Sequence, residues 1–184
     1  MMETISYFLF PVLAGLFSTR LLKEKSEGNR RILVLPSLCL IFVAFLLKFS
    51  VLNTLFYSLF LISAVTDSLT GEVYEIGLYL LAPVSLVLFY SESSYIAAFF
   101  IILIPLYRKS VKLQYYFGEG DLWILLFISM AYGRSVFYSL VYASILGLGY
   151  TVIRRKKEVY FVPFLYLGLL LSNINEINKL FLIY

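Results

Sequence analysis

Long runs of apolar residues, separated by short polar clusters, follow one another along the whole chain. A helix that crosses the core of a bilayer needs roughly 20 mostly apolar residues, and it satisfies its backbone hydrogen bonds internally. The pattern therefore predicts an all-α fold, a polytopic membrane bundle of about eight transmembrane helices. The predicted spans are Ile5–Leu22, Ile32–Phe49, Leu52–Thr66, Ile76–Tyr90, Ser94–Tyr107, Asp121–Tyr132, Ser135–Ile153 and Val159–Leu171.

The spans are assigned to a single transmembrane domain, residues 1–184, because neither an internal repeat nor a linker interrupts the pattern. Several spans are shorter than ideal, so we expect some helices to be tilted or surrounded by others. After the last span, polar residues are interspersed with apolar ones from Asn173 to Tyr184. This tail is expected to form an interfacial amphipathic helix that anchors the chain.

Composition points to the same environment. The 184 residues are 61% hydrophobic and only 14% charged, against roughly 25% charged residues in a soluble domain. An integral membrane protein is expected, with the lipid bilayer as a partner and the first apolar run retained as a span. The net charge of +4 predicts no nucleic-acid partner, because the basic residues are spread over loops beside anionic headgroups.

Lysine and arginine positions predict the orientation, because cytoplasmic loops collect positive charge. With the predicted spans, twelve of the fifteen basic residues fall on one face, and the other face receives Lys48, Arg134 and Lys179. The first face is predicted to be cytoplasmic, in a multi-pass protein of the cell membrane with both chain termini outside. The twelve residues are Arg20, Lys23, Lys25, Arg30, Arg31, Arg108, Lys109, Lys112, Arg154, Arg155, Lys156 and Lys157.

The chain contains no histidine. Serine and cysteine triads, histidine-ligated zinc or haem, and HExxH peptidases all need an imidazole and are excluded. No metal and no cofactor are expected. The single cysteine, Cys39, has no partner for a disulfide or a zinc site and is expected to be a small packing residue.

Only two aspartates occur in the chain, Asp67 and Asp121. A carboxylate in a membrane domain is costly and marks a candidate functional site. Asp67 ends the third predicted span and Asp121 opens the sixth, so the charge-based topology puts both on the cytoplasmic face. Two neighbouring carboxyl groups can share one proton, so that one activates water and the other protonates the scissile group. We therefore expect Asp67 and Asp121 to form a catalytic dyad.

Each aspartate also has a structural interpretation. Asp121 is well placed to cap a helix N-terminus, where the helix dipole favours an ionised carboxylate. Asp67 lies near a helix C-terminus, where the dipole opposes negative charge, so capping does not account for it. We hypothesise that Asp121 is the ionised base of the free enzyme and Asp67 the protonated partner.

The second aspartate closes the sequence Gly118-Glu119-Gly120-Asp121. Gly118 and Gly120 are expected to form an active-site loop, in which positive φ angles let a substrate backbone pass close to Asp121. The alternative is an ordinary loop, in which glycines occur because they interrupt regular secondary structure.

The segments around both aspartates resemble motifs of a known family. Leu61–Val73 around Asp67, and the GxGD element ending at Asp121, look like the two aspartate motifs of type IV prepilin peptidases. Val159–Gly168 is similar to a late span of that family, although Val162 replaces a glycine. The loop after Asp67 also lacks a proline that bacterial members often carry. The resemblance covers about residues 55–168.

The resemblance implies a membrane aspartyl endopeptidase with Asp67 and Asp121 as its catalytic pair. Such enzymes remove the short basic leader, or class III signal peptide, from type IV prepilin precursors and, in archaea, from archaellin precursors at the cytoplasmic face. Bacterial bifunctional members carry a cysteine-rich insert and also methylate the new N-terminus. This chain has one cysteine, so the resemblance is to an archaeal-type peptidase without methylation.

Acidic residues near the aspartates are candidates for binding a basic leader. The loop after the third span carries Glu72 and Glu75 and no basic residue, and Glu119 lies beside Asp121. Together they would attract a basic leader peptide; the alternative is that the two loop glutamates are solvated or pair with Arg108 or Lys112. Aromatic residues around the GxGD element favour interfacial anchoring over a substrate groove. They are Tyr115, Tyr116, Phe117 and Trp123.

Three other functions remain open. Presenilin and signal peptide peptidase share GxGD but place the first aspartate after a tyrosine inside a span, whereas Thr66 precedes Asp67 here. A serine–lysine peptidase would need Lys48 and Ser50, which no motif supports. A small proton- or cation-coupled transporter would carry its carboxylates near the midplane of the bilayer.

Overall fold

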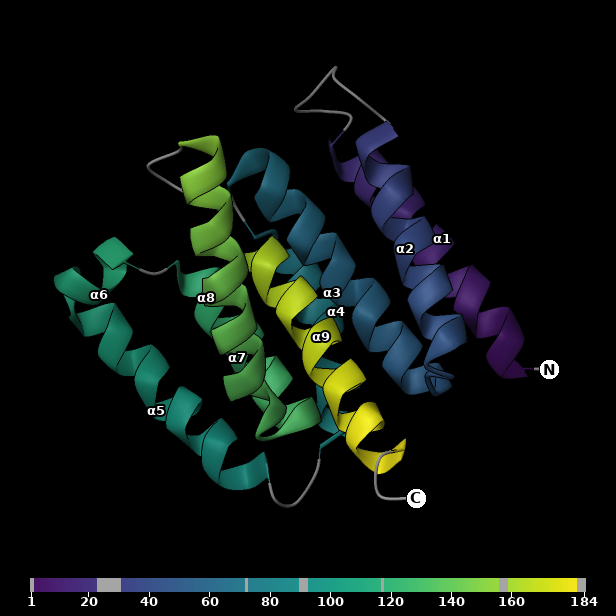
Figure 1. The fold of residues 1–184 in the computed structure, drawn as a ribbon. Helices are drawn as coiled ribbons and strands as arrows, with labels where there is room; N and C mark the ends of the chain where they lie inside the picture. Colours follow the sequence, from purple (N-terminus) through teal and green to yellow (C-terminus); the bar gives the residue numbers. More distant parts are fainter. Residues whose placement is uncertain are drawn as a thin grey trace. The chain divides into compact units, whose positions relative to one another are not determined.

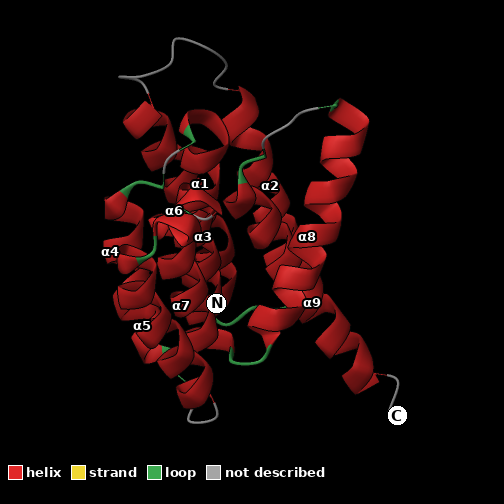
Figure 2. Cartoon of the chain, turned by 90° about the vertical axis from the view of Figure 1, so that its left-hand side faces the viewer, coloured by secondary structure: helices red, strands yellow, loops and turns green. Residues whose placement is uncertain are grey.

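The computed structural model describes residues 2–22, 31–71, 73–89, 93–116, 118–155 and 159–181. The chain folds as two compact units, Met1–Val84 and Ser85–Tyr184. Every regular element in the described residues is a helix (Figures 1 and 2), which confirms the all-α prediction. The single-domain assignment stays a prediction.

The first unit is built around one central helix. It contains α1 (Met2–Leu22), α2 (Arg31–Leu46), α3 (Val51–Thr70) and most of α4 (Glu75–Val87). Helices α1 and α2 run antiparallel, and both contact α3 (Figure 1). Three aromatic side chains of α3 have no exposed surface and supply much of the core: Phe56, Tyr57 and Phe60.

Both ends of α3 carry residues that satisfy its terminal backbone groups. Ser50 is the N-cap, and its hydroxyl accepts the Asn53 N–H at 3.2 Å. Gly71 ends the helix with φ of 72°, a left-handed conformation that glycine adopts without steric cost. Ser50 therefore has a capping role, which accounts for it without a serine–lysine peptidase.

The second unit contains α5 (Ser94–Lys109), the short α6 (Val111–Tyr116), α7 (Glu119–Tyr132), α8 (Ser135–Arg154) and α9 (Phe161–Phe181). Helix α7 contacts both α5 and α8. Its buried face includes Leu122, Ile124, Leu125 and Ile128. Helices α8 and α9 form an antiparallel hairpin that packs along its length (Figure 1).

Small residues bring α8 and α9 close together. A Cβ atom added at Gly168 would overlap the carbonyl oxygen of Ser139 and lie 3.0 Å from the Ala143 nitrogen. Ser139 and Ala143 are both fully buried, and Gly147 follows one turn later along the same face. Such small residues at four-residue spacing are typical of helix pairs that pack in membranes. We call this contact the α8–α9 seam.

Two described helices, α3 and α8, are long and apolar enough to cross a membrane. Helix α3 is mostly buried and α8 mostly exposed. The exposed face of α8 carries Leu148, Val152 and Ile153, which are 66, 77 and 80% exposed. Shorter apolar helical segments cover Pro36–Leu46, Glu75–Val87 and Phe161–Ile174.

Each predicted span overlaps one described helix, and the crossing of a membrane by all eight stays a prediction. The three largest differences are the following. Helix α3 continues to Thr70, four residues past the predicted span, because its last turn keeps helical hydrogen bonds up to the Gly71 cap. The short α6 has no counterpart among the predicted spans. Helix α9 runs without a break to Phe181, so the segment from Asn173 to Phe181 continues the last helix. Residues 182–184 lie outside the described part.

Cys39 also departs from expectation. It lies on α2 and is exposed, whereas Leu40 beside it is buried. The prediction that Cys39 is a packing residue is therefore wrong within the described structure, because the buried positions of α2 are Ser37, Leu40 and Ala44.

Candidate functional site

Asp67 lies in the last turn of α3, and only 6% of it is exposed. Its backbone carbonyl accepts the Gly71 N–H at 2.8 Å, so the helix cap is bonded to this residue. The neighbouring hydroxyls are bonded to carbonyls of their own helix: Thr66 to Ser63, Ser68 to Val65 and Thr70 to Thr66. Asp67 is therefore a buried carboxylic residue near a helix C-terminus, as predicted.

Ser63 lies one helical turn before Asp67 and was not singled out from the sequence. Its hydroxyl is buried and has no hydrogen-bond partner among the described residues. It faces α4, where a Cβ added at Gly77 would lie 2.7 Å from the Ser63 Oγ. Residues four apart lie on the same face of a helix. The four-residue spacing of Ser63 and Asp67 was therefore the sequence signal that a polar side chain lies beside Asp67.

Asp121 is the third residue of α7 and is partly buried. Its Oδ2 atom accepts the backbone N–H of Gly118 at 3.1 Å. Gly118 is the N-cap residue, and Asp121 caps the first turn from the third helical position, which fits the structural interpretation of Asp121 as a helix-capping residue. This carboxylate satisfies a backbone donor that the helix itself leaves unpaired.

The glycines of the GxGD element have a different role from the one predicted. Gly118 has φ of −77° and ψ of 147°, an extended conformation that any residue adopts. Gly120 lies inside the first turn of α7. The prediction of a positive-φ loop is wrong, because the helix begins at Glu119. Gly118 lies close to the carboxylate: an added Cβ would lie 3.3 Å from the Asp121 Oδ2, tighter than an ordinary contact, so the carboxylate would have to shift by a few tenths of an ångström.

Glu119 is paired within the second unit. Its Oε1 atom accepts the Nε–H of Arg108 at 3.0 Å and a second N–H of the same guanidinium. The indole N–H of Trp123 donates to the same oxygen at 3.4 Å. The hydrogen bond from Arg108 lowers the pKa of Glu119, partial burial opposes that shift, and the bond from Trp123 lowers the pKa further.

The other predicted substrate-binding residues lie outside this pair. Glu75 is exposed in the first turn of α4, and Glu72 lies outside the described residues. Arg108, which was considered as a partner for those two glutamates, bonds to Glu119 instead. A role for Glu72, Glu75 and Glu119 in binding a basic leader stays a prediction.

The aromatic residues near the GxGD element are only partly described. Trp123 is half-buried, and its ring lies 6.1 Å from that of Phe127 on the same helix. Phe117 and the side chains of Tyr115 and Tyr116 lie outside the described part. The same holds for the side chains of six cations of the predicted inner loops: Lys23, Lys25, Arg30, Arg31, Lys156 and Lys157.

One helical turn therefore brings together Gly118, Glu119, Gly120 and Asp121 in the second unit. Asp67 and Glu75 belong to the first unit, and the pairing of the two aspartates stays a prediction. The described residues contain no cluster of three histidine, cysteine, aspartate or glutamate side chains that could hold a metal ion.

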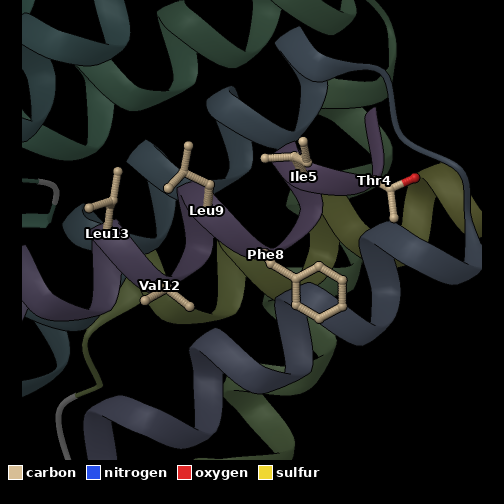
Figure 3. Close-up of a pocket in the computed structure, with 6 residues that line it drawn as sticks. All are labelled: Thr4, Ile5, Phe8, Leu9, Val12 and Leu13. Atoms are coloured by element: carbon tan, nitrogen blue, oxygen red, sulfur yellow. The ribbon is translucent and has the colours of Figure 1, made fainter. Parts of the chain in front are cut away.

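A shallow hollow of about 500 Å³ lies along one face of α1 (Figure 3). Its lining is apolar except for one threonine, and no acid or base lines it to activate that hydroxyl. The hollow is therefore an apolar surface rather than a catalytic cleft. The residues that line it are Thr4, Ile5, Phe8, Leu9, Val12 and Leu13.

Comparison with known proteins identifies no relative. No protein-family model matches the chain, and neither the curated proteins nor the solved structures contain a significant match.

Proposed function

We propose that this chain is a multi-pass membrane aspartyl endopeptidase of the prepilin peptidase type. It removes the basic leader peptide from prepilin or archaellin precursors at the cytoplasmic face of the cell membrane. The observation that carries the proposal is the turn at the start of α7, where the Gly118 N–H binds the carboxylate of Asp121. The second catalytic carboxyl is Asp67, which α3 keeps nearly buried close to its C-terminal cap.

In the proposed reaction, water is the nucleophile and two carboxyl groups move its proton. The ionised carboxylate accepts a proton from water as the water oxygen bonds to the scissile carbonyl carbon. The protonated carboxyl hydrogen-bonds to the carbonyl oxygen, and a proton passes to the amide nitrogen as the carbon–nitrogen bond breaks. Two carboxyl groups at short range are not both ionised, because their negative charges would repel each other. One group therefore stays protonated while the other is ionised.

The membrane assignment has two supports. Helices α3 and α8 are long and apolar enough to cross a bilayer, and the exposed faces of α1, α2, α5 and α8 carry large apolar side chains. An apolar surface this extensive is favourable only against lipid or another apolar surface. The proposed eight-span topology then puts the C-terminal end of α3 and the start of α7 on the side where basic residues accumulate.

The proposal is tested by co-expressing the chain with a precursor that carries a class III signal peptide. The wild-type chain is expected to shorten the precursor, and Asp67→Asn and Asp121→Asn are each expected to abolish shortening. The Asp121→Asn side chain keeps an oxygen that can accept the Gly118 N–H, so its loss of activity would report chemistry rather than folding. Helix content and elution from a sizing column provide the check on folding.

The site of cleavage separates this function from its alternative. A cut after the basic leader and before the apolar segment supports the prepilin peptidase type. A cut inside the apolar segment would indicate a presenilin-type enzyme instead. Shortening that survives either substitution would refute the dyad.

A further inference from the structure

The end of α5 and the start of α7 are joined by an ion pair. Arg108 lies in the last turn of α5 and Glu119 is the first residue of α7, eleven positions later. Two N–H groups of the guanidinium donate to one carboxylate oxygen, with the Nε–H bond at 3.0 Å. The signs suit the helix dipoles, since a cation lies at a C-terminus and an anion at an N-terminus.

The chain between these residues is held at the α5 side by a second set of bonds. The side-chain amide of Gln114, in α6, donates to the carbonyl oxygens of Tyr107 and Arg108 at 3.3 and 3.1 Å. The Ser110 N–H donates to the Tyr107 carbonyl at 3.0 Å. These bonds satisfy carbonyls that the end of α5 leaves unpaired and fix where α6 begins relative to Arg108.

The α7 side of the pair is continuous with the proposed catalytic turn. Glu119 lies directly between Gly118, whose N–H binds Asp121, and the rest of the GxGD turn. Trp123, one helical turn later, donates to the same Glu119 oxygen that receives Arg108. A displacement of Glu119 therefore displaces the hydrogen-bonded turn that carries Asp121.

We propose that Arg108 is a positioning residue, which holds the Asp121 carboxylate in place through Glu119. The inference rests on the proposed peptidase function, and it assigns Glu119 to the internal architecture of the site rather than to the leader peptide. The side chains of Arg108 and Glu119 are 61 and 41% exposed. Exposed ion pairs contribute little to global stability, so breaking this one changes the geometry of the turn without unfolding the protein.

The test is a charge swap measured on the full-length chain in detergent with a basic-leader precursor. Arg108→Glu and Glu119→Arg each lower kcat about tenfold, because small displacements of a reacting group are costly, while KM changes less than twofold. The double variant, Arg108→Glu with Glu119→Arg, recovers most of the lost kcat. Recovery is incomplete because the swapped charges oppose the helix dipoles. Lys109→Glu, an exposed cation one position along α5, is the matched control and leaves kcat unchanged.

Amide hydrogen exchange gives a readout that does not depend on activity. The amides of residues 118–122 exchange faster in each single variant and regain protection in the double variant. A raised KM with unchanged kcat would make Glu119 a leader-binding residue and overturn the inference, as would a double variant no better than the singles. If the wild-type chain cuts no precursor but the exchange pattern holds, the proposed function fails and the ion pair's hold on the turn is supported.

Discussion

The α8–α9 seam predicts that Gly168→Ala destabilises the protein through a backbone clash. The added Cβ would overlap the Ser139 carbonyl oxygen and lie 3.0 Å from the Ala143 nitrogen and 3.2 Å from the Ser139 carbonyl carbon. All three are backbone atoms, which cannot rotate away as a flexible side chain can. The two helices must therefore separate, at a cost of about 1–3 kcal/mol, as for other overpacked sites.

Gly149→Ala is the matched control for this substitution. It lies on α8, and an added Cβ there meets no atom within 4 Å. Both substitutions gain about 1 kcal/mol of helix propensity, so the difference between the two variants isolates the packing cost. Gly147→Ala provides an intermediate case, with Phe164 at 3.9 Å, and is expected to behave like Gly149→Ala.

The assay is thermal unfolding of each purified variant in a mild detergent, followed by helical circular dichroism. For a chain of this size each 1 kcal/mol shifts the midpoint by roughly 2–4 °C. Gly168→Ala is expected to unfold several degrees below Gly149→Ala. Equal midpoints for the two variants would refute the close approach of the α8 and α9 backbones.

Three further substitutions test individual contacts. Gly118→Ala lowers kcat about tenfold, because the new Cβ displaces the Asp121 carboxylate; precursor cleavage measures it, and an unchanged rate would contradict the need for space at this glycine. Gly71→Ala lowers the free energy of unfolding by about 1–2 kcal/mol, since its φ of 72° is strained for alanine; a thermal midpoint equal to wild type would count against the left-handed cap. Glu119→Gln destabilises the protein by at most about 1 kcal/mol near neutral pH. Because Arg108 lowers the pKa of Glu119, this contribution is present above the ordinary glutamate pKa and is lost as pH falls through the lowered value, so denaturant unfolding of the two proteins should converge in acid.

The helices were largely predictable from the sequence because each apolar run is long enough to form one. Their ends were less predictable, because helix formation depends on backbone hydrogen bonds and hydropathy does not record them. Ser68 and Thr70 are polar, yet they extend α3 by returning their hydroxyls to carbonyls of the preceding turn. Asn173 likewise does not interrupt α9.

The candidate site was partly predictable, for reasons that differ between its residues. Rarity in an apolar chain identified Asp67 and Asp121, and their positions near helix ends agree with the structure. Gly118 was predicted to provide a positive φ angle, whereas the structure shows extended backbone and a close approach to the Asp121 side chain. Such a contact leaves no signature in the φ preferences of glycine. The pairing of Arg108 with Glu119 had no sequence signal, since the two residues lie on different helices and share no periodicity.

Under the proposed peptidase function, the α8–α9 seam would also constrain how a precursor enters from the lipid. The apolar segment of a prepilin is itself a helix, about 10 Å across with its side chains. At Gly168 the two backbones leave no room even for a methyl group, so a lateral gate between α8 and α9 would require the hairpin to come apart along its length. The hairpin is expected to move as one rigid pair, with the route for the incoming helix along another face of the protein.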